Sequence, residues 1–212
     1  MKINLEHVLP EDIEKRSFEI IESELQGVVI APLEKPVVKR VIHTTADFDY
    51  VKNLKFSENA VENAIAALKN GADILTDTSM AMAGINKTSL GRLGGTVHCF
   101  IGDKDVAEEA KRRNTTRSVV CMEKAVDFEK PVIIAVGNAP TALIRVYELI
   151  CEKKIRPELV IGVPVGFVNV TEAKELIMTT KTEYIAAVGR KGGSNVAAAI
   201  CNALIYMAAG ER

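Results

Sequence analysis

An excess of one charge and paired cysteines are what this sequence most clearly lacks. Its 27 lysines and arginines are balanced by 28 aspartates and glutamates, so the formal net charge is −1 and no overall attraction to nucleic acid or to an anionic membrane is expected. None of its four cysteines forms a CxxC pair, which argues against a zinc knuckle or a thioredoxin-type redox site. We expect buried free thiols at Cys99, Cys121, Cys151 and Cys201.

Long apolar runs and cofactor motifs are also missing. No run reaches the roughly 20 residues of a membrane span, and no basic segment followed by an apolar core opens the chain, so we expect a cytoplasmic protein without membrane contact. The sequence contains no GxxxxGKS or GxxxxGKT, no GxGxxG that opens a helix after a strand, no HExxH and no GxSxG. We therefore predict chemistry that needs no cofactor and no metal site in the protein.

What the sequence does contain is an alternation of short apolar runs with helical patterns. Hydrophobic residues make up 48% of the 212 residues and charged residues 26%, which is typical of a globular domain. Strands are expected at residues 73–76, 97–101, 132–136, 159–163 and 184–188. Because helical segments separate these runs, we predict a three-layer α/β/α sandwich with a five-stranded, mainly parallel sheet. One domain is expected over residues 1–212, with residues 1–36 as its N-terminal helical segment and loop.

The helix predicted at residues 58–70 is the one most clearly delimited by the sequence. Ser57 suits its N-cap and Gly71 suits the stop at its C-terminus. Its inward apolar stripe is expected to consist of Ala60, Val61, Ala64, Ile65 and Leu68. Residues 26–36 are typical of a loop, which would join the N-terminal helix to the rest of the chain.

Polar and glycine-rich stretches follow the predicted strands at residues 76–80, 137–141, 162–167 and 189–195. In a parallel sheet such stretches lie at the carboxyl ends of the strands, where ligands bind, so Thr78, Asn138 and Arg190 are candidates for substrate binding. Further basic residues in polar or glycine-bearing loops are Arg92, Arg117 and Lys191. Each of them alone could be a solvated surface charge, but together they predict an anionic small molecule as the ligand.

His43 is the strongest candidate for a catalytic side chain. The apolar pattern at residues 37–42 indicates a helical turn, on which Arg40 and His43 share one surface because they are three residues apart. A nearby cation disfavours a protonated imidazole and an arriving anion favours it, so His43 is suited to act as a general acid when substrate is bound. The alternative is an ordinary histidine beside a surface arginine. His7 and His98 are expected to be structural.

Ser17 is the one polar member of a helical face in the N-terminal segment. The rest of that face is formed by Ile13, Ile20, Ile21 and Leu25. A hydroxyl in this position needs a partner, because it lies among apolar side chains. It either donates to the carbonyl group four residues earlier or faces a ligand, and the residues alone leave both alternatives open.

Five motifs occur in one consistent order along the chain. They are RVIHTTADFDY at residues 40–50, NTTRS at 114–118, GNAPTAL at 137–143, PVGFV at 164–168 and GRKGGS at 189–194. Together they resemble the precorrin-8X methylmutase family, also called cobalt-precorrin-8 methylmutase, over about residues 10–208. The resemblance implies a flavodoxin-like sheet and a homodimer with active sites at the subunit interface. It also implies an isomerase of cobalamin biosynthesis, which moves a methyl group between adjacent carbons of ring C of a tetrapyrrole.

The resemblance further implies roles for single residues. His43 matches the family's catalytic histidine, which is proposed to protonate the ring C nitrogen. Ser17, Arg40 and Arg117 match residues that bind substrate or support the histidine. The implied substrate is precorrin-8 or cobalt-precorrin-8, whose many carboxylates would explain the basic loops.

The chain departs from the family pattern at one position, and two other functions are alternatives to the methyl shift. Many family members carry Glu-Ser-Lys where this chain has Glu172, Ala173 and Lys174, so no hydroxyl contact is expected at Ala173. A tetrapyrrole carrier that binds pathway intermediates without catalysis is the first alternative function. The second is a methyltransferase or dehydrogenase with an adenosyl or dinucleotide cofactor, which only the α/β pattern suggests.

Overall fold

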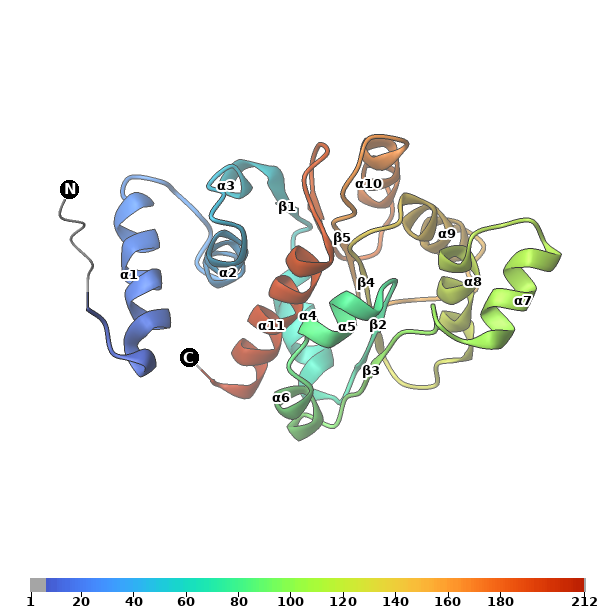
Figure 1. Cartoon of the computed structure of the whole chain (residues 1–212), viewed down its shortest axis with the longest axis horizontal. Helices are drawn as coiled ribbons and strands as arrows, with labels where there is room; N and C mark the ends of the chain where they lie inside the picture. Colours follow the sequence, from blue (N-terminus) through green and yellow to red (C-terminus); the bar gives the residue numbers. More distant parts are fainter. Residues whose placement is uncertain (1–6, 212) are drawn as a thin grey trace.

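The computed structural model describes residues 7–211, which form a six-stranded sheet between two layers of helices (Figure 1). The strands are β1 (Leu54–Phe56), β2 (Asp73–Thr76), β3 (Val97–His98), β4 (Val132–Val136), β5 (Leu159–Gly162) and β6 (Tyr184–Ala187). Their order is β1-β6-β5-β4-β2-β3, and all neighbours are parallel except β1 and β6. Without β1, this is the flavodoxin-like order 2-1-3-4-5 read from the β3 edge. The predicted α/β class is confirmed, and residues 1–6 and 212 of the predicted domain lie outside the described residues.

The prediction of five strands is wrong by one, because β1 adds an antiparallel strand at the edge of the sheet. In β1 Leu54 is buried, whereas Lys55 is exposed. A three-residue run with a polar centre has too little apolar pattern to distinguish it from a loop. At the opposite edge, the strand predicted at residues 97–101 ends at His98, since only two of its residues pair with β2.

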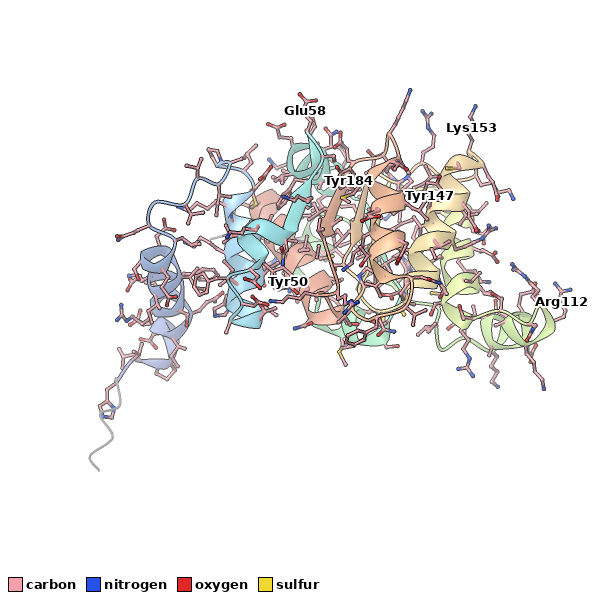
Figure 2. The ribbon with its side chains drawn as sticks, turned by 90° about the horizontal axis from the view of Figure 1, so that it is seen from above. Tyr50, Glu58, Arg112, Tyr147, Lys153 and Tyr184 are labelled. Atoms are coloured by element: carbon pink, nitrogen blue, oxygen red, sulfur yellow. The ribbon has the colours of Figure 1, made fainter. Side chains whose placement is uncertain are left out.

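Two layers of helices cover the sheet. One layer contains α1 (Ile13–Glu24), α2 (Lys35–Thr45), α3 (Tyr50–Asn53), α4 (Ala60–Lys69), α5 (Ser79–Gly84), α6 (Lys87–Arg92) and α11 (Ser194–Ala209). The other contains α7 (Lys104–Arg112), α8 (Arg117–Glu123), α9 (Pro140–Cys151) and α10 (Val170–Met178). Two 3-10 helices span Pro10–Asp12 and Lys124–Asp127. Figures 1 and 2 both show α1 at one end of the molecule and α7 at the other, where Figure 2 labels Arg112.

Both faces of the central strand β4 are buried, as its continuous apolar sequence predicts. Ile133 and Ala135 pack in the layer that contains α11, whereas Ile134 and Val136 pack in the layer that contains α9. Burial of each larger aliphatic side chain contributes roughly 1.5–3 kcal/mol relative to exposure. The strand therefore gives the loops at its carboxyl end a rigid base.

The helix predicted at residues 58–70 is present as α4, and its apolar stripe packs inward as expected. The predicted cap is wrong, because Asn59 rather than Ser57 precedes the first helical residue. The Ser57 hydroxyl instead accepts a hydrogen bond from the Tyr184 N–H at 2.8 Å and donates to the Glu183 carboxylate. Ser57 therefore connects the end of β1 to the start of β6.

The apolar face of α1 differs from the predicted one. Ile21 and Leu25 are buried and Phe18 is half-buried against them. Ile13 and Ile20, which the predicted face included, are 53% and 40% exposed. The helix therefore packs on α2 through a rotated face and leaves apolar side chains uncovered.

The cysteines are less uniformly buried than predicted. Cys121 and Cys201 are buried and Cys99 is half-buried, but Cys151 is exposed, so the expected burial is wrong for Cys151. His98 is structural as predicted, because its Nε2 lies 3.2 Å from the Asp73 Oδ2. No helix within residues 7–211 has the length and apolar character needed to cross a membrane.

Candidate active site

A buried carboxylate, Asp77, fastens two loops together at the carboxyl end of the sheet. It follows β2 directly and is 1% exposed. Its Oδ1 accepts a hydrogen bond from the Gly137 N–H at 2.8 Å, and its Oδ2 accepts from Asn138 at 2.9 Å and Ala139 at 2.8 Å. Burial raises the pKa of Asp77, and the three N–H donors oppose this rise. Asp77 thus fixes the backbone of Asn138 between β2 and β4, where the strand order reverses.

Thr78 connects the carboxyl end of the sheet to α11. Its Oγ1 caps α5 by accepting a hydrogen bond from the Ala81 N–H at 3.1 Å, and it lies 2.8 Å from the Ser194 Oγ. Gly137 allows this close packing, because a Cβ at Gly137 would lie 2.7 Å from the Ser194 Cα. The hydroxyl of Thr78 thus already has two partners in the protein, whereas the neighbouring loop residue Asn138 is exposed.

His43 lies in the last turn of α2 and is exposed. Its imidazole stacks on the Phe18 ring of α1, with centroids 5.0 Å apart and ring planes 20° apart. Such aromatic contacts favour particular ring orientations. One face of the imidazole is therefore supported while the residue remains open to solvent.

Arg40 lies one turn before His43 on α2. Its guanidinium carbon is 4.8 Å from the Phe18 centroid and 5.1 Å from the Tyr206 centroid, and Nη1 is 2.5 Å from the Glu14 Oε1. Phe18 therefore contacts both Arg40 and His43, and the arginine is paired with a carboxylate. Sequence reasoning missed Phe18, Glu14 and Tyr206. The available signal was the place of Phe18 three residues before the buried Ile21 on the same helix.

The Ser17 hydroxyl donates a hydrogen bond to the Ile13 carbonyl oxygen at 2.9 Å. This is the first of the two alternatives that the sequence leaves open. A hydroxyl that donates in this way keeps its oxygen available as an acceptor. Contact between Ser17 and a ligand therefore stays a prediction.

Lys191 connects the loop after β6 to the segment after α2. Its Nζ lies 2.6 Å from the Asp47 Oδ2 and 2.6 Å from the Asp49 Oδ2. These carboxylates hold the pKa of Lys191 above its usual range, and the hydrogen bond from Lys191 lowers the pKa of Asp47. The ammonium group of Lys191 thus already binds two carboxylates of the protein, and its contact with carboxylates of a ligand stays a prediction.

Arg92 lies outside the candidate site. Its Nη1 is 2.9 Å from the Glu211 Oε1, and it ends α6, which leads into the start of β3. Arg92 therefore lies at the amino end of the parallel strands, whereas Asp77 and Thr78 lie at the carboxyl end. The general pattern of basic loops misled the prediction here, because loops at both ends of the sheet contain glycine.

Arg190 and Arg117 are exposed cations, the first in the loop after β6 and the second at the start of α8. The Arg190 guanidinium carbon lies 5.4 Å from the centroid of Phe167, which is 82% exposed. Arg117 is the first residue of α8, directly after Thr116. The Thr116 Oγ1 lies 3.2 Å from the Thr141 Oγ1, which places Arg117 beside the start of α9.

The predicted site residues do not all meet within one chain. Figure 1 shows α2, which carries His43, and α8, which begins with Arg117, on opposite sides of the molecule with α11 between them. Thr78, Asn138 and Arg190 belong to loops in the intervening region. Ala173 is fully buried in the layer of α9 and α10, so the departure from the family pattern lies in the core. Among residues 7–211, no three His, Cys, Asp or Glu side chains are placed to hold a metal ion.

An exposed imidazole and exposed arginines on the loops around a parallel sheet are typical of α/β enzymes that act on anionic small molecules. The family model for precorrin-8X methylmutase matches residues 12–207. The cobalt-precorrin-8 methylmutase of Leptospira interrogans is 44% identical over 214 residues, covering 96% of this chain and 97% of the relative. The solved structure of precorrin-8x methyl mutase from Thermus thermophilus has a TM-score of 0.86 at 39% identity, covering 94% and 98% of the two chains. The chain belongs to the precorrin-8X methylmutase family.

Family membership confirms the resemblance carried by the five motifs. A further relative, the cobalt-precorrin-8 methylmutase of Salmonella typhimurium, is 44% identical over 203 residues, covering 93% of this chain and 95% of the relative. The enzyme class is that of the family, an isomerase that transfers a methyl group within one molecule. The family does not favour the carrier, the methyltransferase or the dehydrogenase.

Proposed function

We propose that this chain moves a methyl group between adjacent carbons of ring C in precorrin-8 or cobalt-precorrin-8, giving hydrogenobyrinate or cobyrinate. The family supports the reaction, and the substrate is supported by the names of relatives, which include both precorrin-8X and cobalt-precorrin-8 methylmutases. The observation that carries the proposal is the exposed imidazole of His43, supported on one face by Phe18.

His43 acts as the general acid. The protonated imidazole gives its proton to the ring C nitrogen, which draws electron density from the macrocycle. One carbon–carbon bond to the methyl group then breaks as the bond to the adjacent carbon forms, and the proton returns to the imidazole. Substrate and product are isomers, so no methyl donor and no oxidant is consumed. A positioned acid contributes about 10²- to 10⁴-fold in rate, and holding the macrocycle in a reactive conformation supplies more.

The remaining candidates divide into three pairs by position. Ser17 and Arg40 support the histidine from α1 and α2, because Arg40 and His43 both contact Phe18. Arg117 and Arg190 bind substrate carboxylates, for which the planar guanidinium group is well suited. Thr78 and Asn138 are proposed as polar contacts to the substrate between the other two pairs.

A homodimer is part of the proposal, with the partner supplying the residues that one chain keeps apart. The separation of α2 from α8 supports this arrangement. So do three exposed apolar side chains beyond the carboxyl ends of the strands, since Met80 in the first turn of α5 is 71% exposed and Phe167 and Val168 in the loop after β5 are 82% and 77% exposed. A groove of about 1240 Å³ between α1 and α11, lined by Phe18 and Tyr206 among others, offers a further surface for a second copy.

Replacement of His43 by alanine tests the proposed role. Turnover of the tetrapyrrole is expected to fall about 10²- to 10⁴-fold, because proton transfer is lost. The dissociation constant of the corrin product is expected to change only a few-fold, since carboxylate contacts dominate affinity. His7→Ala is the matched control, because His7 is exposed and lies before α1. Full turnover by the His43→Ala variant would remove the histidine from the mechanism.

Single-turnover absorption spectra distinguish the enzyme from a carrier. An excess of wild-type protein is mixed with the substrate, and the bound tetrapyrrole is released and identified. The enzyme returns a corrin with the methyl group moved, whereas a carrier returns its ligand chemically unchanged.

A further inference from the structure

Lys174 of α10 is a buried lysine that the mechanism above does not use. The residue is 1% exposed, and its helix neighbours Ala173 and Ile177 are fully buried. Burial of an ammonium group is costly unless the group is hydrogen-bonded. Within residues 7–211, Lys174 forms no ion pair with a carboxylate, and the groups that its ammonium contacts are uncharged.

Those partners are two backbone carbonyl groups of the loop after β6. The Lys174 Nζ donates to the Gly189 oxygen at 2.7 Å and to the Lys191 oxygen at 2.8 Å. Glycines at 189, 192 and 193 all have positive φ angles, of +81°, +159° and +137°. A loop so rich in glycine has little conformational preference of its own. The ammonium group therefore supplies order that the loop sequence does not.

The loop held in this way reaches both halves of the candidate site. The side chain of Lys191 binds Asp47 and Asp49, which follow the helix that carries His43. Arg190 stands between the two anchored carbonyl groups, with its guanidinium over Phe167. A shift of the loop would move Arg190 and would release the segment after α2 at the same time.

We infer that Lys174 is a positioning residue for the methyl shift, which acts through residues 189–193 to fix Arg190 and the end of α2. The consequence for turnover rests on the proposed function, whereas the ordering of the loop does not. A purely structural role, in which Lys174 only fills the core under α10, makes different predictions for both readouts.

The first readout is amide hydrogen exchange of residues 189–193 in Lys174→Met and Lys174→Gln, and it needs no ligand. Methionine keeps the apolar stem without a donor, and glutamine keeps an uncharged donor if methionine does not fold. The control is Ile177→Ala, on the same buried face of α10. Exchange in the loop is expected to rise at least about tenfold in the Lys174 variants and to change little in the control. Equal exchange in all three variants would overturn the inference.

The second readout is a double-mutant cycle in the KM for the tetrapyrrole. Lys174→Met and Arg190→Ala are each expected to raise KM about tenfold, and the double variant is expected to be no worse than the single ones, because both act through one loop. Ile177→Ala is expected to lower the unfolding temperature without raising KM. Additive effects on KM would show that Lys174 does not act through Arg190.

If the wild-type protein bound the corrin product without turning substrate over, the proposed function would fail. The same cycle would then be measured in the dissociation constant of the product. The exchange result would decide the role of Lys174 in either case.

Discussion

At the scale of single residues, Phe18 is the contact through which α1 supports the proposed acid. Its ring stacks on His43 and also lies under the guanidinium of Arg40. We expect Phe18→Leu, which keeps an apolar side chain but loses the flat ring, to lower kcat about two- to tenfold, the equivalent of an aromatic contact. Steady-state rates with the tetrapyrrole measure this effect. Phe18→Tyr keeps the ring and is expected to stay close to wild type, so equal losses in both variants would contradict the stacking role.

Lys174 gives a prediction for stability against pH. Burial lowers its pKa from 10.5 to about 8 in the folded protein, so the unfolded chain binds more protons between these values. The free energy of unfolding therefore rises with pH across this window, and the gain is lost as the pH falls from 10.5 to 8. We expect the free energy of unfolding of the wild type to increase relative to Lys174→Met, by on the order of 3 kcal/mol, between pH 8 and 10.5. Urea denaturation of both proteins measures the difference, and a difference independent of pH would contradict it.

Some residues of the candidate site could be predicted from the sequence and others could not. His43 and Arg40 stand out because helical spacing alone places them on one surface. Phe18 and Lys174 do not, because tertiary packing brings their partners to them. His43 is 25 residues from Phe18 in the sequence, and the loop carbonyl groups are 15 or more residues from Lys174. Asp77 is an intermediate case. The sequence shows a carboxylate directly after a buried strand, but it does not show the three N–H groups that bind this carboxylate.

At the scale of elements, the loop after β6 depends on Gly192. Its φ is +159°, and a Cβ at this position would lie 2.2 Å from the Val163 carbonyl oxygen. We expect Gly192→Ala to cost about 3 kcal/mol or more, because backbone strain and a clash with the main chain add. Gly189→Ala is the control, because nothing lies within 4 Å of a Cβ there and only its φ of +81° opposes alanine, at about 1–2 kcal/mol. Equal destabilisation of the two variants in urea would contradict the clash.

The strands differ in how well the sequence predicts them, and burial is the reason. The bounds of β2 and β4 agree with the predicted ones, because every residue of these strands is buried and the sequence is apolar or polar only at the ends. β1 and β3 lie at the edges of the sheet, where few residues pair and the apolar pattern is short. The sequence predicts a helix cap at Ser57 and gives no sign of its pairing with Tyr184, because these residues are more than a hundred positions apart.

At the scale of the whole molecule, one chain keeps the proposed acid His43 apart from Arg117. The proposed acid lies in the layer of α11, and Arg117 begins a helix of the opposite layer. No local pattern could predict this separation, because it follows from the order of the strands. In the proposed homodimer, we expect twofold symmetry to bring each chain's Arg117 to the other chain's His43.

Mixing two inactive variants tests this arrangement directly. His43→Ala and Arg117→Ala, unfolded and refolded together in equal amounts, are expected to form mixed dimers in half of the molecules. One site of each mixed dimer then has both residues intact, so activity should return to about a quarter of the wild-type value. The matched control is His43→Ala with Arg40→Ala, since both residues lie on α2 and no mixed dimer has an intact site. Recovery in the first mixture alone supports a site shared between chains. If mass spectrometry shows mixed dimers and neither mixture recovers, the site is completed within one chain.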